Sequence, residues 1–211
     1  MKQRPRRQYR RGAVLLAALV MLLALMLGAA ALIRMVESAN LLAGNLAFKR
    51  AATLAAEAGA EAALGWLAQQ SAATLAQDSE TQGYYAADAP NFDASGNRSG
   101  SQLTRVDWQG DQCGGATLAR CLKPASVAGP DAAGHAVRYV VQRLCAASGA
   151  HDMSGTCAFH LTAEAESSSR SGLGYGRAQR LAGIPLAYYR ITARATGPRN
   201  TVSVIEVLVR F

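Results

Sequence analysis

Residues 10–34 read RRGAVLLAALVMLLALMLGAAALIR, and this stretch decides how the chain is organised. Its centre is an uncharged run of 21 residues, Ala13 to Ile33, interrupted only by Gly28 and closed by Arg34. A helix rises about 1.5 Å per residue, so the run spans roughly 30 Å, the thickness of a bilayer's hydrocarbon core. The sequence therefore predicts a membrane-spanning helix over residues 13–34.

Most of the formal net charge of +8 lies before this run. Six basic residues and no acidic residue precede Ala13, and the rest of the chain carries 16 basic and 14 acidic residues. Because this leaves little basic surplus for a binding face, we expect no nucleic-acid partner. The positive-inside rule predicts that the basic end lies in the cytoplasm and that the residues after 34 lie across the membrane.

A cleaved secretory signal peptide is the main alternative to an uncut anchor, since Ala29, Ala30 and Ala31 are small enough to form a cleavage site. The apolar run is longer than the roughly 7–15 residues of a signal peptide's apolar region. The helical pattern also continues beyond these alanines, which favours the anchor.

A second helical half is predicted from Met35 to about Gln70, where alanine is abundant and proline is absent. Its apolar residues recur at helical spacing, at Leu42, Leu46, Leu54, Ala58, Ala62 and the cluster of Leu64, Trp66 and Leu67. This stripe is expected to pack on a globular domain, so residues 35–70 form the amphipathic half of one long helix. Gly44 and Asn45 fit either a local bend or melted turn, or a glycine tolerated in a continuous helix.

The rest of the chain, residues 71–211, has the pattern of a globular domain with short strands. The polar residues 71–100 are expected to form a connector. Strand patterns then follow near 106–108 and at 136–144, 159–166, 188–196 and 201–211. A Ser/Gly-rich loop is expected at 167–176. Gly197, Pro198, Arg199 and Asn200 predict a hairpin turn between the last two. The fold class is therefore α+β, a long helix packed on a small antiparallel sheet.

No catalytic motif is present, and we expect neither an enzyme nor a cofactor or metal site. Two weaker patterns are present. One is a candidate zinc site made of Cys145, His151, Cys157 and His160. The spacing of these residues is not a recognised zinc-ligand pattern. The other is a candidate calcium site made of Asp88, Asn91, Asp93 and Asp111. A solvated loop explains these polar residues equally well. The glycines at 172, 174 and 176 favour a flexible loop over a phosphate-binding turn.

The four cysteines all lie in the distal half of the chain, and their even number suits an oxidising compartment. Three pairings are possible. Closure between sequence neighbours favours one disulfide between Cys113 and Cys121 and another between Cys145 and Cys157.

About the first 70 residues resemble type IV pilin-like proteins, and in particular the PilX-type minor pilins. The elements that carry the resemblance occur in order. They are the leader end Arg11–Gly12, the apolar run without an acidic residue, the AGN segment at 43–45, and the alanine-rich helix AAEAGAEAAL at 55–64. The leader end alone is a weak motif, but the ordered set is specific.

The resemblance implies that residues 1–12 are a basic prepilin leader. A prepilin peptidase would cleave after Gly12 and N-methylate Ala13. The chain would then be a single-pass protein of the bacterial inner membrane before assembly, and would lie in the periplasm and at the pilus tip or cell surface afterwards. Its partners would be other minor and major pilins, contacted through the helix, and a tip adhesin. The implied function is type IV pilus assembly, which supports cell adhesion and twitching motility.

One departure from the family pattern concerns Ala17, the fifth residue of the expected mature chain. Most major pilins have a glutamate there, thought to pair with the N-terminal amine of a neighbouring subunit. An unpaired charge in an apolar core is costly, so a subunit without the acid suits the end of a filament. This predicts a place in the priming or tip complex. The alternatives are a type II secretion tip pseudopilin and a single-pass periplasmic binding or adhesion protein outside any filament.

Overall fold

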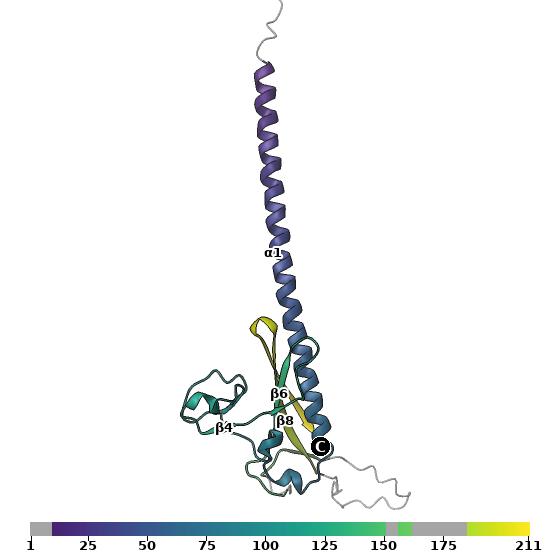
Figure 1. The fold of residues 1–211 in the computed structure, drawn as a ribbon, viewed down its shortest axis with the longest axis vertical. Helices are drawn as coiled ribbons and strands as arrows, with labels where there is room; N and C mark the ends of the chain where they lie inside the picture. The colour runs from purple at the N-terminus through teal and green to yellow at the C-terminus, as the bar shows by residue number, and fades with distance from the viewer. Residues whose placement is uncertain (1–9, 151–155, 162–184) are drawn as a thin grey trace, which may run out of the picture. The chain divides into compact units, whose positions relative to one another are not determined.

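The computed structural model describes residues 10–150, 156–161 and 185–211. Its first element is the helix α1, Arg10–Leu67 (Figure 1). The chain forms two units, Met1–Ala47 and Phe48–Phe211. Helical structure continues through Gly44 and Asn45, so no turn is melted there and the glycine is tolerated within the helix. After Leu67 the hydrogen bonds shorten to the three-residue spacing of a tightened last turn, which ends α1 before the predicted Gln70.

A six-stranded sheet forms the core of the second unit, in the order β1-β6-β8-β7, with β5 also paired to β6 and β9 to β8. The strands are β1 (Tyr84–Tyr85), β5 (Ala125–Ser126), β6 (Ala136–Arg143), β7 (Phe159–Leu161), β8 (Pro185–Gly197) and β9 (Thr201–Arg210). Four of the pairs are antiparallel, but β1 runs parallel to β6. The predicted purely antiparallel sheet is wrong here, because the chain crosses through a second sheet between these two strands.

That second sheet is small and entirely parallel, which again differs from the prediction. Its strands are β2 (Phe92–Asp93), β3 (Thr104–Val106) and β4 (Arg120–Leu122). Residues 71–100 are therefore not all connector, since they contain β1, β2 and the one-turn helices η1 (Thr74–Ala76) and η2 (Glu80–Gln82). Strands of two residues leave no periodic pattern for a sequence to reveal.

The C-terminal hairpin is confirmed. Strands β8 and β9 pair from Gly197 with Thr201 to Tyr188 with Arg210, around the turn η4 (Pro198–Asn200). Strand β6 also matches its prediction, and β7 covers the first part of the strand expected at 159–166. The remainder of that strand and the expected loop at 167–176 lie outside the described residues.

The part of α1 in the second unit packs on the large sheet mainly through alanines, and of the predicted stripe only its last cluster, Leu64, Trp66 and Leu67, takes part. The buried helix residues include Ala56, Ala60, Ala63 and Leu67, which pack in clusters with β6 and β8 residues such as Val137, Ile191, Ala193 and Ala195. Leu54 is 65% exposed, and Ala58 and Ala62 are also exposed. The predicted face is therefore wrong from Leu54 to Ala62, where the helix lies so close to the sheet that small side chains fit between them.

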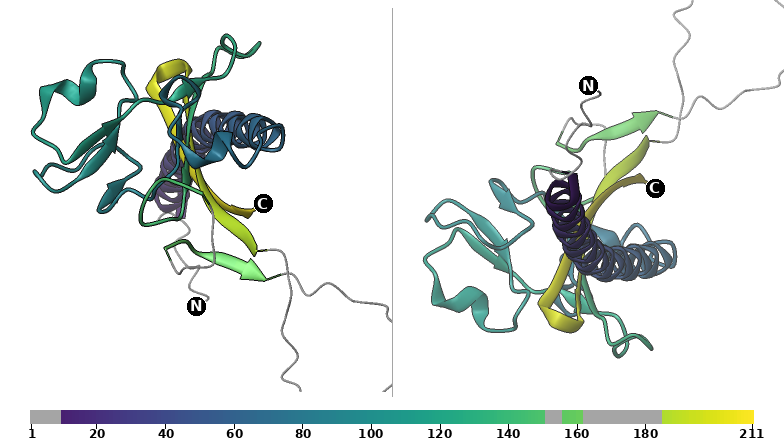
Figure 2. Two further views of the ribbon diagram at one scale, coloured as in Figure 1. Left: turned by 90° about the horizontal axis from the view of Figure 1, so that it is seen from below. Right: turned by 90° about the horizontal axis from the view of Figure 1, so that it is seen from above.

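The opposite face of the large sheet is covered by the second sheet. Neighbouring residues of β6 show this arrangement, because Val141 packs with the helix while Val140 packs with Val106, Trp108 and Leu122. Figure 2 shows α1 and the second sheet on opposite sides of the β8–β9 hairpin. Strand β6 is thus buried on both faces from Tyr139 to Arg143, which fits its three consecutive apolar residues Tyr139, Val140 and Val141.

Candidate functional site

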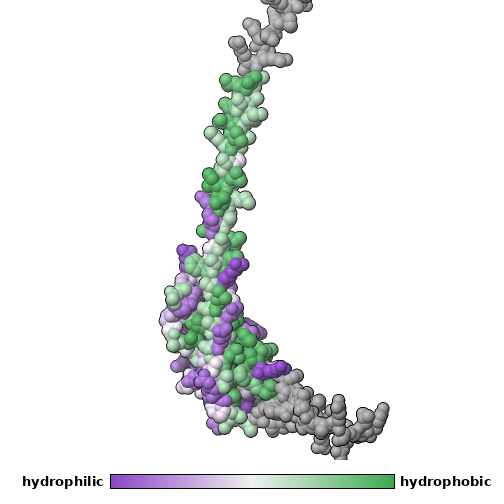
Figure 3. All heavy atoms as spheres, turned by 90° about the vertical axis from the view of Figure 1, so that its right-hand side faces the viewer, coloured by the Kyte–Doolittle hydropathy of each residue, from purple (hydrophilic) through white to green (hydrophobic). Residues whose placement is uncertain are grey.

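The apolar segment of α1 in the first unit is the most unusual surface of the described chain. Every side chain from Ala13 to Ala43 is exposed, and Leu15 and Leu25 are 72% and 73% exposed. Figure 3 shows this part of the helix as a mainly hydrophobic surface. Burying one large aliphatic side chain contributes about 1.5–3 kcal/mol, so a surface of this size indicates contact with lipid or with another protein.

Among the described residues, α1 is long and apolar enough to cross a membrane. No charged side chain lies between Ala13 and Ile33, and the first charges after the run are those of Arg34 and Glu37. A helix also satisfies its own backbone hydrogen bonds, as a segment in lipid must. The length, the composition and the secondary structure therefore agree with the predicted membrane-anchored helix.

One side of this segment is lined by small residues that sequence reasoning did not single out. Ala24, Gly28 and Ala31 lie in a shallow groove bordered by Leu25, Leu32 and Met35. A Cβ added at Gly28 would meet no atom within 4 Å. Small residues at a spacing of three or four let a second helix approach closely in a membrane. In the sequence, the four-residue spacing from Ala24 to Gly28 is the pattern that indicates this face for helix packing.

The expected cleavage position lies at the start of α1. Gly12 and Ala13 both belong to α1, close to the first residue that the structure describes, Arg10. The two residues are adjacent and at the position the resemblance implies, and cleavage itself stays a prediction.

Ala17 lies farther along the same apolar segment and is exposed. Its helical neighbours at the spacing of three and four are Val14 and Met21, both exposed and aliphatic. The run from Ala13 to Ile33 offers no carboxylate to any partner. The first acidic side chain of the helix is Glu37, beyond the run.

Both disulfides pair as sequence proximity favoured. Cys113 bonds Cys121 with 6.1 Å between their Cα atoms, and Cys145 bonds Cys157 with 3.8 Å. The first connects η3 (Gln112–Gly115) to β4, and the second joins the residues just after β6 to those just before β7. Both bonds close short loops beside strands, which restricts the unfolded chain.

The two metal patterns are not assembled. Both thiols of the zinc pattern are in the Cys145–Cys157 disulfide, and the side chains of His151 and His160 lie outside the described residues. Of the calcium pattern, Asp88 pairs with Arg190. The described residues hold no group of three or more His, Cys, Asp or Glu placed to bind a metal ion.

The other two acids of that pattern shape loops. The Asp93 carboxylate accepts hydrogen bonds from the Ser95 hydroxyl and from the backbone N–H groups of Ser95 and Arg98. Burial alone would raise the pKa of Asp93, but these hydrogen bonds outweigh it and hold the pKa below its usual value. Asp111 accepts from the backbone N–H of Gly114. These carboxylates therefore already have structural partners.

A scan of protein-family models, a search of curated proteins and a search of solved structures found no match to this chain.

Proposed function

We propose that this chain is a pilin-like structural subunit, a minor pilin of the PilX type that takes part in type IV pilus assembly in the priming or tip complex. The observation that carries the proposal is the exposed apolar segment of α1, which starts directly after the basic leader end. Such a segment serves twice in this role: it holds the subunit in the inner membrane, and it then packs against the helices of other subunits.

Two features support helix packing in particular. The small residues Ala24, Gly28 and Ala31 provide a face for close helix contact. In the second unit, the helix packs on the sheet but leaves Leu54 exposed. This apolar side chain is therefore available for contact with a partner. A lone membrane anchor needs neither feature.

The globular unit favours this role over the tip pseudopilin of a type II secretion system. Those tip subunits usually carry a large inserted helical domain. In the described residues after α1, the helices are single turns of three or four residues, from η1 to η4.

The experiment is to determine the mass and N-terminal sequence of the protein purified from cells that have a prepilin peptidase. We expect a mature chain that begins at N-methylated Ala13. Gly12→Leu should block cleavage, because a bulky side chain replaces the small residue at the cut. Gly28→Leu is the matched control, since a side chain there meets open space, and it should be cleaved normally.

Other results would contradict the proposal. Cleavage near Ala31 would identify an ordinary secreted protein. An intact leader would identify a plain single-pass membrane protein outside any filament.

A further inference from the structure

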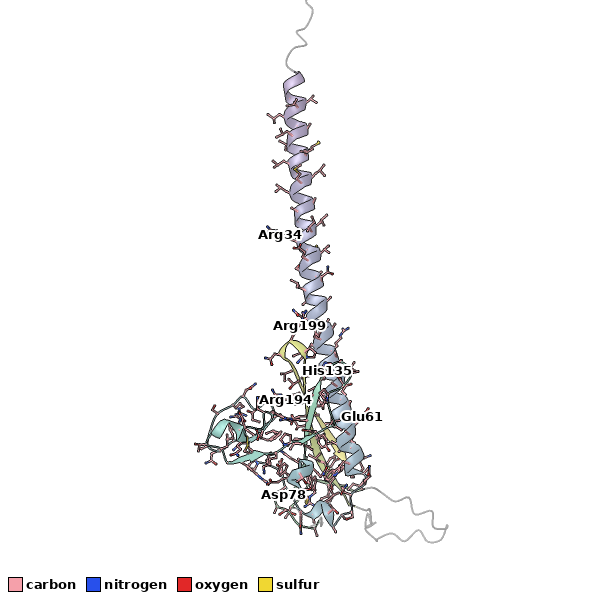
Figure 4. All side chains as sticks on the ribbon, in the orientation of Figure 1. Arg34, Glu61, Asp78, His135, Arg194 and Arg199 are labelled. Atoms are coloured by element: carbon pink, nitrogen blue, oxygen red, sulfur yellow. A yellow bond between two sulfur atoms is a disulfide. The ribbon has the colours of Figure 1, made fainter. Side chains whose placement is uncertain are left out.

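A basic cavity lies on the face of the large sheet that is turned away from α1. It has a volume of about 330 Å³ and is lined by two arginines, Arg138 of β6 and Arg194 of β8, together with Trp108, Gln109, Ala136, Thr196 and Asn200. Figure 4 labels Arg194 on the sheet. None of these lining residues, all from the described part of the chain, is acidic. It belongs entirely to the second unit and is separate from the apolar helix segment.

The two arginines are direct cross-strand partners in the β6–β8 register. Like charges directly opposite each other in an antiparallel pair are destabilising. Neither arginine has an ion pair within the described part of the chain. Four residues earlier on the same strand, Arg190 of β8 is instead paired with Asp88 at 3.0 Å. Among the described residues, nothing therefore compensates the double positive charge of the cavity.

Trp108 holds both guanidinium groups in place. Its indole Nε1 donates to the Ala94 carbonyl at 2.9 Å, which fixes the ring. Arg138 donates from Nη1 to the Trp108 carbonyl at 2.6 Å. The Arg194 guanidinium lies over the Trp108 ring, 5.8 Å from its centroid. The two charges are thus positioned by neutral groups that do not neutralise them.

Arg194 also has an unmet hydrogen-bonding need. Its Nε is buried and has no hydrogen-bond partner in the described ranges 10–150, 156–161 and 185–211. Burial, and then the charge of Arg138, lower the pKa of Arg194. A guanidinium nevertheless stays charged at neutral pH. An unpaired buried donor on a charged group costs free energy that a bound acceptor would recover.

We propose that this cavity binds the oxyanion group, a carboxylate or a phosphate, of a small organic molecule. Two guanidinium groups offer paired donors that match the planar geometry of such anions. The volume lies at the small end of ligand pockets, which suits a ligand of modest size. Thr196 and Asn200 add polar groups at the rim. The proposal does not depend on membership of a filament.

The test is calorimetric titration of the full chain in detergent micelles with benzoate and phenyl phosphate, and with neutral benzamide as the control ligand. We expect saturable binding of an anion at one site per chain, and the tighter of the two identifies the preferred oxyanion. Benzamide should bind at least about tenfold more weakly, because it lacks the charge that the arginines recognise.

Variants of the two arginines make the test specific. Arg194→Gln and Arg138→Gln should each weaken anion binding at least about tenfold, and Arg194→Lys should weaken it less because it keeps the charge. Arg190→Gln, on the same strand but outside the cavity, is the matched control and should leave affinity unchanged. Arg194→Gln removes a like-charge pair, so its melting temperature without ligand should equal or exceed that of the native chain.

The proposal is overturned if neither anion binds saturably up to about 10 mM, a concentration above the dissociation constant of even a weak specific site. It is also overturned if benzamide binds as tightly as the anions, or if Arg190→Gln weakens binding as much as Arg194→Gln. Arg194→Lys, which preserves the charge, decides the question if the glutamine variant does not fold.

Discussion

Asp107 shows how single buried carboxylates organise the loop after β3. It is only 7% exposed, and its two oxygens accept backbone N–H groups of Gly110, Asp111 and Gln112 at 2.8 to 3.0 Å. Burial alone would raise the pKa of Asp107, but the backbone hydrogen bonds outweigh it and hold the pKa below the usual value of an aspartate. The loop it holds leads directly into the disulfide at Cys113.

Asp107→Asn should therefore lower the free energy of unfolding by about 1–3 kcal/mol at pH 7, because an amide NH₂ would face a backbone donor that now binds a carboxylate oxygen. Chemical unfolding, followed by near-ultraviolet circular dichroism, measures the loss. Asp111→Asn is the control, since Asp111 is exposed and accepts a hydrogen bond from the backbone N–H of one residue only; its effect should be smaller. An equal loss in both variants would contradict this role for Asp107.

The same residue predicts a pH dependence. Its folded-state pKa is below the unfolded value, so its contribution to stability is complete above about pH 4 and is lost as the pH falls through the folded pKa. Unfolding free energies of the native chain should decline below pH 4, and Asp107→Asn should make that decline shallower. A decline of the same slope in the variant would show that other groups cause it.

At the scale of elements, the distance between α1 and the large sheet is set by small residues. Gly59 is the closest point, because a Cβ there would overlap Cγ1 of Val137 and come within 3.4 Å of the Ala193 Cβ. Gly65, one and a half turns later on the same helix, has open space around it. The two glycines thus have different physical roles in one element.

Gly59→Ala should destabilise the second unit by about 0.5–2 kcal/mol, because the steric overlap with a stiff β-branched side chain exceeds the gain in helix propensity. Gly65→Ala should stabilise it by about 0.5–1 kcal/mol, since only the propensity changes. Thermal unfolding of the full chain in detergent compares them. If Gly59→Ala were as stabilising as Gly65→Ala, the helix and the sheet would not be in close contact at this point.

At the scale of the whole molecule, the proposed filament role depends on the apolar helix having no acid at Ala17. An N-terminal amine left in an apolar surrounding without a partner is costly. A subunit that supplies no carboxylate is therefore disfavoured along a filament shaft and suited to its end.

Ala17→Glu should raise the amount of this subunit along the shaft of purified filaments, measured by quantitative mass spectrometry. Ala18→Glu is the matched control, because it adds the same charge about 100° around the helix, and it should not raise incorporation. The tip assignment is wrong if the native chain is already the bulk subunit of the filaments. This prediction rests on the proposed function, whereas the anion-binding test does not.

The sequence by itself determined the features that depend on local pattern. An uncharged run of 21 residues predicts the long helix, and the turn residues between 197 and 200 predict the hairpin. Proximity along the chain favoured the disulfide pairs that the structure contains. The interpretation of Gly12, Ala13 and Ala17 rests instead on a family resemblance, and the structure shows only that all three belong to α1.

Only the tertiary structure decided which residues meet across the chain. It buried the alanine face of α1 and exposed Leu54, because the fit of a helix to a sheet depends on side chains from distant strands. It made β1 parallel to β6 and brought Arg138 opposite Arg194 for the same reason. Helix and hairpin patterns are written in neighbouring residues, whereas strand register and the basic cavity arise from contacts between residues tens of positions apart.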